Sequence, residues 1–222
     1  MTRGDEFVRE KRAAALAAAA LVADGMRVGL GTGTTVAELV PALAARRLSI
    51  TCVATSPATE RLARSEGLHV RRFAGLDRLD IAIDGADEVD PNFNLTKGGG
   101  GAHTRERIVA AAADRFVVIV SSNKLVGALH PPVPLELVAF GLAATLRALG
   151  ATTRRDAPPT PDGGVLADYG GAVGDPAALA AHLDGVPGVV AHGLFPPSLV
   201  DTVLVARGDR VDAVRPGLSA GP

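Results

Sequence analysis

Short apolar segments alternate with helix-forming segments along the first 120 residues, and this alternation restricts the fold more than any other feature. Apolar strands are expected at 26–30, 50–54, 68–73, 79–83 and 116–120. Helices are expected before and between them, at 5–23, 36–46, 57–67 and 102–113. Strands that alternate with helices form a parallel sheet covered on both faces. We therefore expect an α/β domain that binds its ligand at the carboxyl ends of the strands.

The pattern changes after Lys124, where three prolines between 131 and 134 indicate a boundary. The next elements are expected in the order strand, helix, strand, strand, helix, strand, from 133 to 194. This split-βαβ order predicts a second, smaller α+β domain. A last apolar strand at 203–206 is expected to return to the first sheet. The expected domains are 1–129 plus 200–222 for the first and 130–199 for the second.

Composition excludes several classes of protein. The 222 residues include 23 Lys and Arg against 24 Asp and Glu, so no basic field attracts nucleic acid, and the 3% of aromatic residues are too few for base stacking. Cys52 is the only cysteine, which rules out an internal disulfide and fits a reducing cytoplasm. The Ala-rich run 13–23 follows Asp5, Glu6 and Glu10, which favours a helix over a signal peptide. We expect a cytoplasmic protein without nucleic-acid or membrane partners.

The segment Gly31–Thr35, with the sequence GTGTT, lies between an expected strand and an expected helix. Glycines let the backbone approach a ligand, and a helix N-terminus favours an anion. The loop matches neither a dinucleotide-binding motif nor a Walker A loop, so a monophosphate fits it best. The alternative is a tight turn capped by threonine. The candidate ligand-binding residues are Thr32, Gly33, Thr34 and Thr35.

The stretch from Asp84 to Glu106 gathers acids, a lysine and four consecutive glycines. Asp84 and Asp87 follow an apolar strand and are either catalytic acids or turn residues. No histidine stands at a useful spacing, so no metal site is expected. Lys97 with Gly98–Gly101 predicts an oxyanion site, and the alternative is a flexible turn. Glu106, in the first turn of a helix, is either a general base or a complement to the helix dipole.

Together these stretches resemble the type A family of ribose-5-phosphate isomerases. The matching segments are GLGTGTT (29–35), DGADEVD (84–90), KGGGGAHTRE (97–106), SSNK (121–124) and GVVAHGLF (188–195). The resemblance implies interconversion of ribose 5-phosphate and ribulose 5-phosphate in the pentose phosphate pathway. It also implies a Rossmann-like domain with a smaller ferredoxin-like lid, no cofactor, and a homodimer or larger homo-oligomer.

The resemblance also implies a role for each matching residue. Glu106 would be the general base that moves a proton between carbons 2 and 1 through an enediolate. Lys97 and the amides of Gly98 to Gly100 would stabilise the negative oxygen, while Asp84 and Asp87 would handle hydroxyl protons and ring opening. Further substrate contacts are implied for the loop residues Thr32, Gly33, Thr34, Thr35, Gly85, Ala86, Gly98, Gly99 and Gly100, and for Lys124.

Two other functions are compatible with the same sequence. A non-enzymatic sugar-phosphate sensor would share the general architecture, but only about two dozen residues precede the first strand, too few for a DNA-reading module. One half of an acyl-CoA transferase would share it too, with a glutamate that forms a covalent thioester. The joint occurrence of the motifs favours the isomerase.

Overall fold

The computed structural model describes residues 3–217, which form two compact units. The first unit comprises residues 3–86, 105–125 and 198–217, and the second comprises 87–104 and 126–197. The segment 87–104 groups with the second unit, although it lies within the range 1–129 expected for the first domain. Among the described residues, no helix is both long and apolar enough to cross a bilayer.

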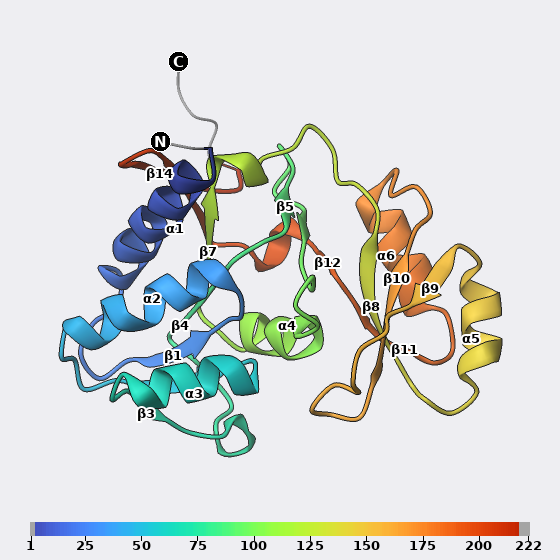
Figure 1. The fold of residues 1–222 in the computed structure, drawn as a ribbon, viewed down its shortest axis with the longest axis horizontal. Coiled ribbons are helices and arrows are strands. Elements are labelled where there is room, and N and C mark those ends of the chain that lie inside the picture. Colours follow the sequence, from blue (N-terminus) through green and yellow to red (C-terminus); the bar gives the residue numbers. More distant parts are fainter. Residues whose placement is uncertain (1–2, 218–222) are drawn as a thin grey trace. The chain divides into compact units, whose positions relative to one another are not determined.

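A seven-stranded sheet in the order β14-β13-β7-β4-β1-β2-β3 forms the centre of the first unit (Figure 1). Its strands are β1 (Arg27–Leu30), β2 (Thr51–Ala54), β3 (His69–Val70), β4 (Ile81–Asp84), β7 (Phe116–Ser121), β13 (Thr202–Arg207) and β14 (Arg210–Val214). All neighbouring pairs are parallel except β13 and β14. The strand order reverses between β1 and β4, and open α/β sheets bind ligands at such a point.

Helices cover both faces of this sheet. They are α1 (Arg3–Ala19), α2 (Thr34–Ala45), α3 (Pro57–Ser65) and α4 (His103–Ala111), with short 3₁₀ turns η1 (Phe73–Gly75), η2 (Ser122–Lys124) and η3 (Pro197–Leu199). Val28 and Leu30 of β1 belong to the core that α1 and α2 share with the sheet. Because side chains alternate along a strand, Gly29 faces the opposite side, where α4 packs.

The first helix ends earlier than its sequence suggests. We expected it to continue to residue 23, but α1 ends at Ala19. The guanidinium of Arg46 donates to the carbonyl oxygens of Ala19 and of Val22, the latter at 2.5 Å from Nη1. Carbonyls at a helix end need such partners, so this distant arginine satisfies the C-terminus of α1.

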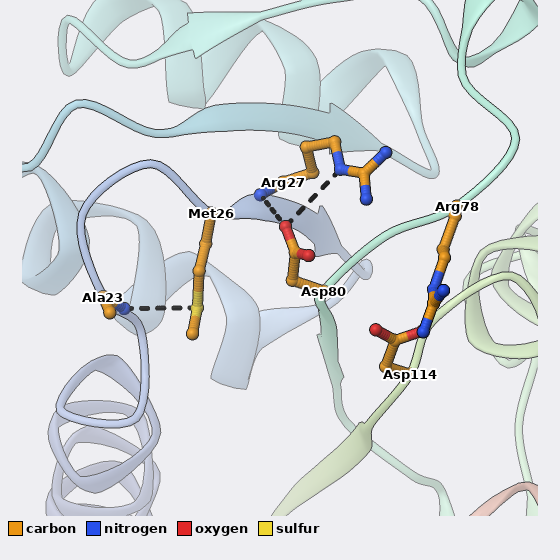
Figure 2. Close-up of polar contacts among 6 residues, drawn as sticks. All are labelled: Ala23, Met26, Arg27, Arg78, Asp80 and Asp114. Atoms are coloured by element: carbon orange, nitrogen blue, oxygen red, sulfur yellow. Dashed lines mark hydrogen bonds and ion pairs between the residues drawn. The ribbon is translucent and has the colours of Figure 1, made fainter.

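Asp80 fixes the amino ends of β1 and β4 beside each other (Figure 2). Its Oδ2 accepts the backbone N–H of Arg27 at 2.6 Å and the Arg27 Nε–H at 3.5 Å. The backbone N–H of Arg27 is the main reason that the pKa of Asp80 lies below its ordinary value. A second ion pair in the same view joins Arg78 to Asp114. The two Asp80 contacts join the amino ends of the strands whose carboxyl ends lead to the Gly31 loop and Asp84.

The second unit contains a four-stranded antiparallel sheet in the order β11-β8-β10-β9. Its elements are β8 (Val133–Leu137), α5 (Leu142–Leu149), β9 (Thr152–Arg154), β10 (Val165–Tyr169), α6 (Pro176–Asp184) and β11 (Val189–His192). This is the strand and helix order expected from the sequence. The sheet order, in which the first strand lies between the third and the fourth, is the ferredoxin-like arrangement.

A three-stranded sheet in the order β12-β6-β5 also belongs to the second unit, and the sequence did not predict it. Its strands are β5 (Glu88–Val89), β6 (Leu95–Thr96) and β12 (Leu194–Phe195). Asp90 shapes the turn between β5 and β6 by accepting the backbone N–H groups of Asn92 and Asn94, both at 2.8 Å. This sheet leads the chain from Asp87 to Lys97.

Candidate active site

Asp84 ends β4 at the point where the strand order reverses, next to the Gly31 loop. Its side chain is 3% exposed, and its Oδ1 accepts the backbone N–H groups of Thr32 at 3.1 Å and Gly85 at 2.7 Å. A Cβ at Gly31 would overlap the Asp84 carboxyl group. Glycine at position 31 therefore lets the carboxylate lie directly against the backbone of the loop, a contact that the motif GTGTT did not predict.

The Gly31 loop is held by two threonines that sequence reasoning missed. The hydroxyls of Thr32 and Thr55 are hydrogen-bonded at 2.8 Å, and Thr59 donates to the carbonyl of Gly31 at 2.9 Å. Gly33 has a φ of +116°, which favours glycine, and it precedes α2 without a side-chain cap. Thr34, the first residue of α2, is exposed, and the uncapped N–H groups at a helix N-terminus are suited to bind an anion. Thr55 directly follows β2, which is the only signal that could have identified it.

Glu106 stands in the first turn of α4 and is 5% exposed. Val109, three residues later on the same face of the helix, lies over Gly29, where an added Cβ would overlap its side chain. Helix α4 thus rests directly on β1, the strand that leads into the Gly31 loop. The first unit therefore places the carboxylate of Glu106 on the sheet-facing side of its helix, rather than on a solvent-exposed face.

Lys124 ends η2, immediately after β7. Strand β7 is parallel to β4, with Val118 beside Asp84, so Lys124 follows the same edge of the sheet as the Gly31 loop. Glu10 of α1 anchors this segment, because it accepts the N–H of Ser122 at 2.8 Å and that of Gly208 at 2.9 Å. No sequence pattern predicts this role of Glu10.

In the second unit, Lys97 follows β6 and is 3% exposed. Its backbone N–H donates to the carbonyl of Gly193 at 2.8 Å, and its Nζ lies 5.5 Å from the centre of the Phe195 ring. An ammonium over an aromatic face is stabilised by the ring quadrupole. The lysine is therefore held in a defined place and is not the solvated side chain of a flexible turn.

The glycine loop after Lys97 is ordered by specific contacts. Gly99 donates its N–H to Oδ2 of Asp87 at 2.8 Å, and Gly101 donates to the carbonyl of Gly98 at 2.9 Å. Gly98 and Gly101 have φ values of +102° and +75°, a region that favours glycine. The Asp87 carboxylate thus uses one of the three amides, Gly98 to Gly100, that the family resemblance implied as oxyanion donors.

Three further residues surround this loop in the second unit without having been predicted. His103 is fully buried, and its ring fills the space where a Cβ of Gly98 would lie. Glu136 of β8 is buried and accepts the hydroxyl of Thr104 at the start of α4. Arg155 donates to the carbonyls of Gly98 and Gly99. The roles of Glu136 and Arg155 do not follow from local spacing, since each depends on a contact with a residue 32 or more positions away.

The predicted site residues are distributed over both units. The first unit holds Asp84 and Glu106 together with Thr32, Gly33, Thr34, Thr35, Gly85, Ala86 and Lys124. The second holds Asp87 and Lys97 together with Gly98, Gly99 and Gly100. The chain passes from one unit to the other after Ala86 and again before Arg105, within the two motifs that carry the acids and the glycines. Among residues 3–217, no group of three His, Cys, Asp or Glu side chains is arranged to hold a metal ion.

Comparison with known proteins adds independent information. The family model described as ribose 5-phosphate isomerase A (phosphoriboisomerase A) matches residues 51–210. The ribose-5-phosphate isomerase A of Sphingopyxis alaskensis is 45% identical over 222 residues, covering 93% of this chain and 96% of that protein. The ribose-5-phosphate isomerase A of Nitrobacter hamburgensis is 44% identical, covering 83% of this chain and 88% of that protein.

Solved structures of proteins with the same name also superpose on this chain. Ribose 5-phosphate isomerase A from Methanocaldococcus jannaschii superposes with a TM-score of 0.88 at 32% identity, covering 96% of this chain and 100% of that chain. The protein from Neisseria gonorrhoeae gives a TM-score of 0.90 at 29% identity, with coverage of 96% and 98%. A translation initiation factor eIF-2B from Pyrococcus horikoshii OT3 has a TM-score of 0.54 at 16% identity, a likeness of fold alone. The chain therefore belongs to the ribose-5-phosphate isomerase A family.

Proposed function

We propose that this protein is a ribose-5-phosphate isomerase, an aldose–ketose isomerase that interconverts D-ribose 5-phosphate and D-ribulose 5-phosphate. Family membership supports this function. The observation that carries it in the structure is the buried carboxylate of Glu106 on a helix that rests directly on β1, the strand leading into the Gly31 loop. A base at Glu106 and a phosphate at the Gly31 loop would then lie at the same edge of the sheet.

The chemistry requires a base and a way to stabilise negative charge on oxygen. We propose that Glu106 removes the proton from carbon 2 of the open-chain aldose and returns it to carbon 1. The intermediate is an enediolate, so a single carboxylate serves both steps if the oxyanion is stabilised. The reaction oxidises carbon 2 and reduces carbon 1 within one molecule, so it needs no external oxidant or reductant, and we propose that the enzyme uses no cofactor and no metal.

Lys97 and the glycine loop are the proposed oxyanion site. The ammonium of Lys97 is held beside Phe195, and Gly99 already donates its N–H to Asp87. We therefore assign the oxyanion donors to Lys97 and the N–H groups of Gly98 and Gly100. Asp87, kept in place by Gly99, and Asp84, kept in place by Thr32, would exchange sugar hydroxyl protons and open the ring.

The phosphate is proposed to bind at the N-terminus of α2. The amides and hydroxyls of Thr32–Thr35 and the ammonium of Lys124 would contact it, while Gly85 and Ala86 would line the sugar. Binding energy from a phosphate remote from carbons 1 and 2 holds the sugar in a reactive position.

We propose that residues 1–129 with 200–222 form the catalytic domain and that 130–199 form a ferredoxin-like lid. The active protein would be a homodimer or larger homo-oligomer, and it would work in the cytoplasm. The pathway would be the non-oxidative branch of the pentose phosphate pathway.

The test is an assay of the purified protein with ribose 5-phosphate in the presence of a chelator, following ketose formation. The proposal requires ketose to form, and a protein that binds the sugar phosphate without converting it would be a sensor instead. A glutamyl adduct sensitive to hydroxylamine would point to an acyl-CoA transferase. The relatives reported above favour neither alternative.

A further inference from the structure

Arg155, which follows β9, contacts the glycine loop from a distant part of the chain. Its Nη1–H group donates to the carbonyl oxygens of Gly98 at 3.0 Å and Gly99 at 3.2 Å. Its Nε and Nη2 donate to the two carboxylate oxygens of Asp168 on β10, at 2.8 Å and 2.6 Å. One guanidinium thus joins a bidentate ion pair to two consecutive carbonyls, a geometry that only arginine provides.

These contacts fix the orientation of two peptide groups. The Gly98 carbonyl and the Gly99 N–H belong to one planar trans peptide, so they point in opposite directions. Arg155 holds the oxygen of this group while Asp87 accepts its N–H at 2.8 Å. In the next group Arg155 holds the Gly99 oxygen, which directs the N–H of Gly100 away from the guanidinium.

A glycine loop needs such constraints more than other segments. Four consecutive glycines lose more conformational entropy on ordering than any other sequence of that length. The loop also lies close to β10, because a Cβ at Gly101 would overlap Leu166. Glycines have no side chains that could fix the loop. The hydrogen bonds from Arg155 to the carbonyl oxygens of Gly98 and Gly99 therefore help to order it.

We propose that Arg155, held by Asp168, is a positioning residue for the isomerase reaction. It orients the peptide groups of residues 98–100 so that the N–H of Gly99 holds Asp87 and the N–H of Gly100 is directed to the substrate oxygen. The kinetic part of this inference rests on the proposed function, whereas the ordering of the loop does not. A partly exposed ion pair that served stability alone would contribute little and would not require the two glycine carbonyls.

The test compares Arg155→Lys with wild type. The matched control is Arg154→Lys, at the neighbouring arginine, which is exposed. Lysine keeps the charge but cannot reach four acceptors in a planar fork. We expect kcat to fall by about 10- to 100-fold, because oxyanion donors are displaced. KM should stay within about threefold, since the phosphate contacts are unchanged. The control should match wild type in both.

The second readout is independent of activity. Backbone ¹⁵N relaxation should give order parameters of about 0.85 for Gly98–Gly100 in wild type and below about 0.6 in Arg155→Lys. Asp168→Asn, which weakens the support of Arg155, should shift both readouts in the same direction, and it decides the matter if Arg155→Lys does not fold.

Unchanged order parameters would show that Arg155 does not order the glycine loop. A mobile loop with unchanged kcat would show that Arg155 is not a positioning residue for the reaction. A wild-type protein without isomerase activity would instead overturn the proposed function, and relaxation alone would then decide whether Arg155 orders the loop.

Discussion

A methyl group has no room at Gly31. An added Cβ would overlap the carboxyl group of Asp84, which accepts the N–H of Thr32 at 3.1 Å. Glycine is therefore needed at position 31 because of this close contact and not only because it favours turns. The pairing of β1 with β4 brings the loop and Asp84 together. The local motif predicted a ligand-binding loop, but only the sheet register shows which acid lies against it.

Gly31→Ala should therefore displace the carboxylate of Asp84. We expect kcat for isomerisation to fall about 10- to 100-fold, and the free energy of unfolding to fall by about 1–3 kcal/mol because of overpacking. Gly75→Ala is the matched control, since an added Cβ there meets nothing within 4 Å. Steady-state kinetics and urea denaturation check both effects. Equal behaviour of the two variants would show that the close approach has no consequence.

The sequence predicted the candidate site residues, but it did not predict the contacts that hold them in place. Lys97 before four glycines is a strong local signal because such a run is costly to order. In contrast, Thr59 and Arg155 act through hydrogen bonds to residues 28 and more than 50 positions away. No spacing in the sequence encodes these pairs, so they become visible only when the fold is known.

At the scale of elements, the buried Glu10 of α1 forms hydrogen bonds to two other segments of the first unit. Burial raises its pKa, but the hydrogen bonds from the N–H groups of Gly208 and Ser122 outweigh this effect, so the pKa lies below its ordinary value. The carboxylate connects α1 to η2 and to the turn between β13 and β14. An ionised Glu10 therefore stabilises the fold.

Glu10→Gln should lower the free energy of unfolding at pH 7 by about 1–3 kcal/mol, because a charged acceptor of three hydrogen bonds is lost. Since the folded-state pKa lies below the unfolded value of about 4.3, this contribution is present above that pH and is lost as the pH falls through the folded pKa. Urea denaturation between pH 7 and pH 3 measures it.

The matched control for Glu10→Gln is Glu66→Gln, at an exposed glutamate. The control should follow wild type at every pH. If the difference between wild type and Glu10→Gln stayed constant down to pH 3, the ionisation of Glu10 would not be the source of its stabilisation.

Elements with strong terminal signals were predicted best. Ser56 and Asp175 both precede a proline, and each accepts a backbone N–H at the start of its helix, from Thr59 at 3.1 Å and from Ala177 at 2.9 Å. Strands β5 and β6 have two residues each and were missed, because two residues show no periodicity. Strand β14 was missed as well, since it pairs only at the sheet edge.

At the scale of the whole molecule, Cys52 reports on global unfolding. It lies in the middle of β2 with no exposed surface, and burial raises its pKa to about 12. A thiol reagent at pH 8 should therefore not label the folded protein and should label it fully in urea. Rapid labelling under native conditions would show that the first unit opens at β2 without complete unfolding.

The raised pKa of Cys52 also predicts a pH effect. Because the folded pKa exceeds the unfolded value of about 8.5, the stabilising contribution is present below that pH and is lost as the pH rises toward 12. Between pH 8.5 and pH 10 wild type should lose about 2 kcal/mol more than Cys52→Ala. Parallel curves for the two proteins would contradict this account.

The division into two units shows what the sequence could not supply at this scale. The alternation of strands and helices predicted the parallel sheet, and the split-βαβ order predicted the second sheet. The grouping of 87–104 with the second unit was not predictable, because it depends on the pairing of β6 with β12, almost 100 residues later.

The central claim is that the carboxylate of Glu106 carries the proton between adjacent sugar carbons. The most direct measurement is the kcat of Glu106→Gln for ribose 5-phosphate, together with the Kd of the substrate by calorimetry. We predict that the Kd stays within about threefold, because glutamine has nearly the same shape as glutamate. The kcat should fall by about 10²- to 10⁴-fold. A variant that turns over within a few-fold of wild type would show that another group is the base.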